Sequence, residues 1–211
     1  MAPRGRPQIL SDEALLEAAK RVFLEEGVGA TTAAIARRAG ISESVIFHRY
    51  KTKEGLFIAV LDQQMRVAPA LEALASKVGQ GDIAETLFDL AMGIVEASKA
   101  LMPFMTLAAT MARASNWKLD QLRQRISRPQ PVHVRSLELL EDFFDREAKA
   151  RRLRAVDPAL LARVFWGAVI QHIMEKVWWG LQEALPVSTP AYLRGLIDLL
   201  LSGAARSPSR R

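Results

Sequence analysis

Apolar residues recur along this chain at the three- and four-residue spacing of amphipathic helices, from near its start to near its end. In residues 11–26, for example, Leu15, Ala19, Val22 and Phe23 fall on one helical face. Period-two runs rich in Val, Ile and Thr, which predict strands, are essentially absent. The pattern therefore predicts an all-α fold.

Capping residues set the expected ends of these helices. Ser11, Ser42 and Thr52 are expected N-caps, and either Thr31 or Thr32 caps the second helix. Pro103 is expected in a first turn, which divides the middle of the chain into two helices. Residues 116–128 are expected to form a loop or a frayed helix. The expected helices are 11–26, 31–39, 42–49, 52–65, 82–101, 103–114, 132–151, 158–184 and 190–202.

The formal charge of +6 is concentrated at the two ends of the chain. Residues 1–53 carry a net +3 and residues 204–211 carry the other +3, whereas residues 54–203 are neutral. A basic N-terminal segment favours a polyanionic partner such as DNA. An ordinary protein surface also tolerates such an excess, so the charge alone leaves both interpretations open.

The segment Thr32–Tyr50 has the pattern of a helix-turn-helix. Ala36 supplies the small residue needed where two helices touch, and Gly40 tolerates the positive φ of the turn. The side chains left outward on the second helix would face the major groove of DNA, and they are Ser42, Glu43, Ser44, Phe47 and His48. A plain helical hairpin could place Ala and Gly in the same way.

Both flanks of this segment carry further groups suited to DNA. Upstream, Arg4 and Arg6 stand in a proline-bounded arm that resembles the core of AT-hook peptides and suits the narrow minor groove. The alternative is an ordinary disordered N-terminus. Downstream, Lys51 and Lys53 stand at the start of the helix that Thr52 caps, where charge and free backbone N–H groups together suit a phosphate.

Residues 9–61 resemble the N-terminal domain of the TetR/AcrR family of bacterial regulators. The resemblance rests on an Ala-Ala-x-x-Val-Phe core, Gly27, Ile35-Ala36, Ala39-Gly40 and Lys53-Glu54-x-Leu56, together with Thr31, Thr32 and Ser42. It implies a homodimer that binds a palindromic operator on double-stranded DNA, usually as a repressor released by a small ligand. It also implies three head helices followed by a larger helical body for ligand binding and dimerisation.

The resemblance divides the chain into four parts. These are a basic arm at 1–8, a helix-turn-helix domain at 9–53, a ligand-binding and dimerisation domain at 54–203, and a disordered basic tail at 204–211.

Four positions depart from the family pattern, among them Tyr50, which stands where Phe is usual. Val45 and Phe47 stand where Thr and Tyr are usual, and each lacks a hydroxyl that often bonds DNA. Each lost bond costs about 1 kcal/mol, although Phe47 can still contact a thymine methyl. Arg49 stands where His is commoner and adds a positive charge near the DNA backbone. The operator sequence is therefore left open.

The last two helices are apolar on more than one side. Residues 158–184 and 190–202 carry too much apolar surface for helices that bury one face. A second subunit can cover the remainder, as the resemblance implies. A monomer with a deep helical core is the alternative.

Methionine and aromatic residues of the body suit a bulky apolar or aromatic effector, although such residues are more often plain core. The candidate ligand-binding residues are Phe104, Met105, Met111, Trp117, Phe143, Phe144, Trp166, Ile170 and Met174.

Other chemistries have little support in the sequence. The chain has no cysteine, no phosphate-binding Gly-rich loop and no nucleophile elbow, so no enzymatic activity and no cofactor are expected. His172 and Glu175 share a helix face without the three or four ligands of a metal site, so no metal is expected. The longest apolar run, Val164–Ile170, is too short for a bilayer, and a cytoplasmic protein without a membrane partner is expected. The remaining rivals are a small-molecule-binding protein that has lost its operator and a non-specific architectural DNA binder.

Overall fold

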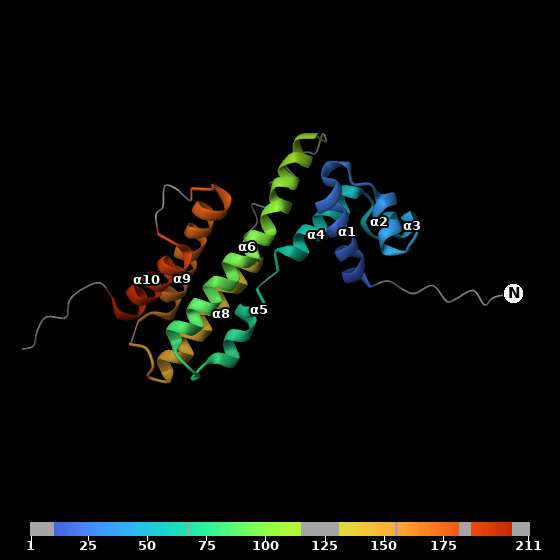
Figure 1. Ribbon diagram of the computed structural model, residues 1–211. Coiled ribbons are helices and arrows are strands. Elements are labelled where there is room, and N and C mark those ends of the chain that lie inside the picture. The colour runs from blue at the N-terminus through green and yellow to red at the C-terminus, as the bar shows by residue number, and fades with distance from the viewer. Residues whose placement is uncertain (1–10, 67, 115–130, 155, 182–186, 204–211) are drawn as a thin grey trace, which may run out of the picture. The chain divides into compact units, whose positions relative to one another are not determined.

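The computed structural model describes residues 11–66, 68–114, 131–154, 156–181 and 187–203, and helices without strands fill these ranges (Figure 1). This confirms the predicted all-α fold. The α-helices are α1 Asp12–Glu26, α2 Thr32–Ala39, α3 Glu43–Tyr50, α4 Lys53–Gln64, α5 Pro69–Glu72, α6 Ile83–Ala114, α8 Pro131–Lys149, α9 Pro158–Ile173 and α10 Thr189–Ser202. Shorter elements are the 3₁₀ turns η1 Gly27–Gly29 and η2 Ala73–Lys77, and the π-helix η3 Met174–Trp178.

The described residues form two compact units, and the boundary between them crosses α6 at Pro103. The first unit, called the head below, holds residues 11–66 and the second half of α6. The second unit, called the body, holds α5, η2, the first half of α6, α8, α9, η3 and α10. The domain boundary expected at residue 53 stays a prediction.

The head is built around α1. Its predicted apolar face is buried, with Leu15 and Phe23 at 0% exposure, and it packs on α2 and α4. The rings of Phe23 and Phe57 meet edge to face with centroids 5.1 Å apart. Local caps fix the helix starts, since the Ser11 hydroxyl accepts the Ala14 N–H and the Thr52 hydroxyl accepts the Gly55 N–H.

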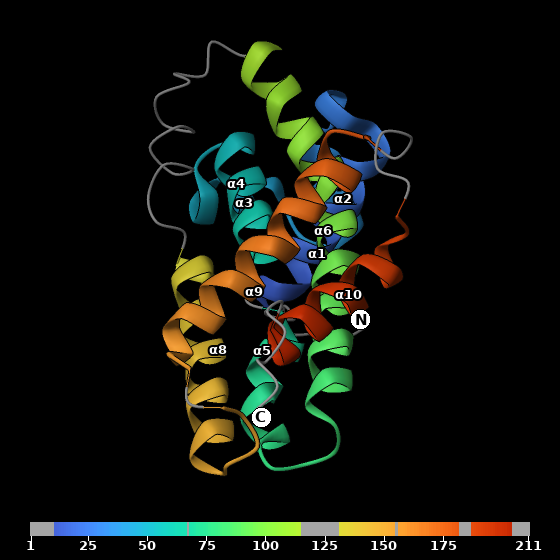
Figure 2. The same ribbon diagram turned by 90° about the vertical axis from the view of Figure 1, so that its left-hand side faces the viewer.

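The body is a helical layer in which α8 packs along α9, and α10 packs on α9 (Figure 2). Its core is a continuous apolar cluster whose fully buried members include Leu87, Leu140, Phe144, Phe165 and Leu193. Packing of these side chains is the main source of the body's stability.

A buried carboxylate joins two loops of the body. Glu147 accepts the Gly79 N–H at 2.8 Å and forms an ion pair with Arg152 at 3.4 Å. Arg152 in turn donates to the Gly81 carbonyl oxygen. The end of α8 is therefore tied to the turn that precedes α6.

The break predicted at Pro103 was wrong, because α6 runs through this residue from Ile83 to Ala114. A proline inside a helix removes one hydrogen bond and costs about 3 kcal/mol. Buried side chains on both sides, such as Val95 and Phe104, hold the helix continuous and offset that cost. Packing thus overrides the local signal.

Two further elements differ from the sequence expectation. No helix was expected between residues 65 and 82, yet α5 and η2 form there because Leu71 and Leu74 are buried in the body core. The helix expected over 158–184 changes its hydrogen bonding after Ile173, and Trp179 donates to the Met174 carbonyl. Gly180 then takes a φ of 65°, which favours glycine and turns the chain.

α6 has the length and composition of a helix that could cross a membrane, from Ile83 to Met111. Core helices of packed proteins pass the same test, and here Leu87, Leu90 and Ala91 are buried in the body core. Part of this helix therefore belongs to the body core.

Candidate nucleic-acid interface

The helix-turn-helix predicted from the sequence is α2, a sharp turn and α3. The Thr31 hydroxyl caps α2 by accepting the Ala34 N–H at 3.1 Å. Gly40 ends α2 with a φ of 68°, in the left-handed region that glycine tolerates best. The Ile41 N–H then donates to the Ala36 carbonyl at 3.0 Å, which closes the turn. The backbone of the motif is therefore fixed by its own sequence.

The two helices of the motif are held together by small and β-branched residues. Ile35 and Ile46 are both at 0% exposure and Ala36 is at 4%. They lie on the side of the motif that faces the rest of the head, which leaves the opposite side of α3 to solvent.

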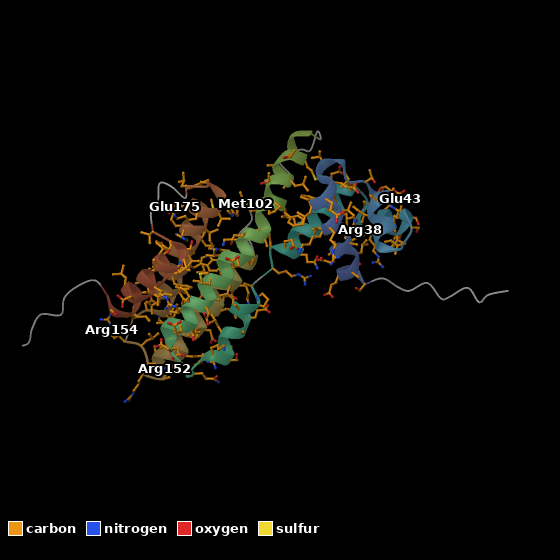
Figure 3. All side chains as sticks on the ribbon, in the orientation of Figure 1. Arg38, Glu43, Met102, Arg152, Arg154 and Glu175 are labelled. Atoms are coloured by element: carbon orange, nitrogen blue, oxygen red, sulfur yellow. The ribbon has the colours of Figure 1, made fainter. Side chains whose placement is uncertain are left out.

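That outer side of α3 presents the residues predicted to face DNA. Ser42, Glu43, Ser44 and His48 are exposed, and Phe47 keeps 47% of its surface accessible. Figure 3 labels Glu43 on α3 and Arg38 on α2. Their contact with DNA stays a prediction.

Ser42 holds the N-cap position of α3, but its side chain makes no cap bond. Its hydroxyl lies 2.7 Å from the Ser44 hydroxyl instead. Ser42 therefore takes the predicted N-cap position, but without a side-chain cap bond, because a neighbouring hydroxyl competes for its side chain.

Several side chains that are predicted to contact DNA are held in place by hydrogen bonds or ion pairs within the head. Thr32 donates to Glu43 at 2.7 Å, and Arg49 pairs with Asp12 at 2.7 Å. Lys51 donates to the His48 carbonyl at 2.9 Å, and Lys53 donates to the Val28 carbonyl at 3.0 Å. Apart from Lys51 and His48, which are three residues apart, these contacts join residues in different elements, so helical periodicity does not predict them.

Arg38 and Glu25 form a two-pronged pair between α2 and α1, with both N–O distances at 2.6 Å. The hydrogen bond from Arg38 lowers the pKa of Glu25, and the same bond raises the pKa of Arg38. No sequence pattern predicts this pair, because its members are 13 residues apart, which is not a helical contact spacing.

Residues 15–60, which hold most of this head, match the family model described as bacterial regulatory proteins, tetR family. The head is therefore that of the TetR family, bacterial transcription regulators that bind DNA through a helix-turn-helix.

Solved structures agree with this fold along nearly the whole chain. A TetR/AcrR-family regulator from Thermobifida fusca is 22% identical with a TM-score of 0.59, and the match covers 93% of this chain and 100% of that one. A protein from Mesorhizobium loti assigned to the TetR family is 20% identical with a TM-score of 0.62, covering 90% and 93%. The regulator FadR from Bacillus subtilis, solved with stearoyl-CoA, is 19% identical with a TM-score of 0.57, covering 92% and 100%. At these identities the likeness establishes the fold.

The candidate ligand-binding residues divide between the two units. Phe143, Phe144 and Trp166 are buried in the body core cluster, and Ile170 packs against it. Phe104, Met105 and Met111 lie on the second half of α6, in the head unit. Met174 begins the π-helix. Arg4, Arg6 and Trp117 lie outside the described residues.

One hollow of about 190 Å³ opens on the body, between the start of α6 and α10. Its lining is mixed, with apolar Phe88 and Ile197 beside charged Asp198 and Arg194. Arg194 covers Phe88, with its guanidinium carbon 4.0 Å from the ring centre. No candidate ligand-binding residue lines it. The predicted pocket therefore stays a proposal.

Proposed function

We propose that this protein is a dimeric, ligand-responsive TetR-family repressor that binds a palindromic operator. The observation that carries the proposal is the exposed face of α3 on a head whose turn is fixed at Thr31 and Gly40. A rigid helix with an outward N-terminal half suits insertion into the major groove.

In this proposal, the DNA-facing residues divide into base and backbone contacts. Residues at the start and middle of α3 reach base edges, namely Ser42, Glu43, Ser44, Phe47 and His48. The remaining cations and hydroxyls, together with the arm, serve the backbone and the minor groove. They are Arg4, Arg6, Thr31, Arg49, Lys51 and Lys53, whereas Thr32 acts through Glu43, to which its hydroxyl donates.

The proposed dimer forms through α9 and α10. Leu160 and Val164 on α9 keep 53% and 45% of their surface exposed, and Leu199 on α10 keeps 53%. The exposed glycines Gly167 and Gly195 lie on the same faces, one or two turns from these side chains. Small residues allow close approach of another helix, so the two faces suit helix packing against a second copy.

The effector in this proposal is a bulky apolar or aromatic molecule that binds the body. The fold-level relative FadR was solved with stearoyl-CoA, a ligand with a long apolar chain. A cytoplasmic location follows from the proposed role on chromosomal DNA.

Selection from a pool of random DNA duplexes tests the proposal. The full-length protein should enrich one sequence with two inverted half-sites, their centres about 34–36 Å or a multiple of that apart. Enrichment of no motif, or of a single unpaired site, would contradict a dimeric operator-binding regulator.

A further inference from the structure

Glu43 is an unusual group to find on a surface that should face DNA. It is the first residue of α3 and is exposed. DNA phosphates repel a carboxylate, so this side chain weakens binding unless it meets a hydrogen-bond donor. In the major groove, the donors are the exocyclic amino groups of the bases.

The carboxylate is held in place from the other helix of the motif. The hydroxyl of Thr32, the first residue of α2, donates to Glu43 Oε2 at 2.7 Å. Thr32 is thus a positioning residue for Glu43. A side chain that is already ordered loses less conformational freedom when it binds, so this bond prepares Glu43 for contact.

One oxygen of the carboxylate stays available. Within the described part of the chain, Oε1 of Glu43 accepts no hydrogen bond, and no Lys or Arg forms an ion pair with the side chain. The start of α3 favours a negative charge through its free N–H groups, which explains why no cation is needed there. The geometry therefore presents a single, fixed acceptor at the outer end of α3.

Among the bases, cytosine suits such an acceptor best. Its amino group is the donor that cytosine offers in the major groove, whereas adenine places the N7 acceptor beside its amino group, where it opposes a carboxylate. Guanine and thymine offer acceptors at these positions.

We propose that Glu43, oriented by Thr32, accepts a hydrogen bond from the amino group of a cytosine in each operator half-site. This inference rests on the proposed function, because it needs a sequence-specific operator.

The test compares base preference in the full-length wild type, Glu43→Gln and Thr32→Val. Each protein is used to select duplexes from a random pool, and its affinity is then measured on the wild-type operator and on the same operator with the cytosine pair replaced by a thymine pair. Glu13→Gln removes the same charge from an exposed site on α1 and serves as the matched control. Thermal melting establishes that each variant is folded.

The wild type should select cytosine at one position of each half-site and bind the thymine operator about tenfold or more weakly. Glu43→Gln should reduce the ratio of affinities for the cytosine and thymine operators severalfold. It should also select adenine at this position, since glutamine forms hydrogen bonds with adenine. Thr32→Val should give an intermediate ratio, and Glu13→Gln should keep the wild-type ratio.

An unchanged cytosine preference in folded Glu43→Gln would overturn the inference and leave the proposed function standing. Failure of the wild type to select any operator would overturn both.

Discussion

At the scale of single residues, Lys53 combines a contact within the head with N–H donors that remain for DNA. Lys53 lies in the first turn of α4 and donates to the Val28 carbonyl, so its ammonium is held near the start of that helix. An ammonium beside free helix N–H groups suits a phosphate. The bond to Val28 uses one of three N–H donors and leaves two for DNA.

Lys53→Ala should therefore weaken binding to all DNA sequences by a similar factor. The plot of log affinity against log salt concentration should become shallower by about one unit. Lys99→Ala, which removes a lysine paired with Glu96 in the body, is the control and should change neither quantity. Anisotropy titrations at several salt concentrations measure both, and an unchanged slope in Lys53→Ala would rule out a phosphate contact.

Gly55 illustrates a close backbone approach between α3 and α4. A Cβ added to Gly55 would overlap the carbonyl oxygen of Tyr50, which is backbone and cannot rotate away. Gly55→Ala should destabilise the protein by about 1–3 kcal/mol. Gly29→Ala has open space for its Cβ and should leave the free energy of unfolding within about 0.5 kcal/mol. Urea unfolding measures both changes, and equal stability of the two variants would refute the predicted clash.

At the scale of elements, the head was predictable because its signals are local. Thr31, Gly40 and Thr52 each fix a helix end through bonds to residues within four positions, and such bonds leave a pattern in the sequence. The pairing of Thr32 with Glu43 left none, because tertiary structure creates it. The helix break expected at Pro103 was wrong for the converse reason: packing on both sides of this residue outweighs the free-energy cost of a proline within a helix.

The contact between α9 and α10 contains a titratable group. His172 on α9 is buried, stacks on Tyr192 at a centroid distance of 4.3 Å, and lies 3.0 Å from the Thr189 hydroxyl. Burial lowers the pKa of His172, Lys176 lowers it further and Glu175 partly opposes this. The folded protein therefore favours neutral His172.

This gives the stability a defined pH dependence. Below about pH 6.5, the ordinary histidine pKa, the unfolded chain takes up a proton that folded His172 resists, so stability falls with pH until the folded pKa is passed. Above that window the contribution is fully present. His172→Gln should flatten the fall in unfolding free energy between about pH 7 and pH 5. Exposed His48→Gln is the control and should retain the fall; equal slopes in the two variants would contradict this assignment.

At the scale of the whole molecule, the proposed dimer accounts for the exposed apolar faces of α9 and α10. Leu199→Glu should place a charge inside the interface and convert the dimer to a monomer. Val134→Glu makes the same kind of change at a 43% exposed residue of α8 and should leave the dimer intact. Light scattering after size-exclusion chromatography gives both masses. A dimeric Leu199→Glu protein would show that the subunits pair elsewhere.

The central claim is that α3 reads a specific DNA sequence. The most direct measurement is the ratio of affinities of full-length protein for its selected operator and for a scrambled duplex of the same length and composition, taken at physiological salt. The ratio should be about 10³ or more, since base-edge contacts add to the phosphate contacts that both duplexes share. A ratio near one would show that the head binds DNA through charge alone and would contradict the account.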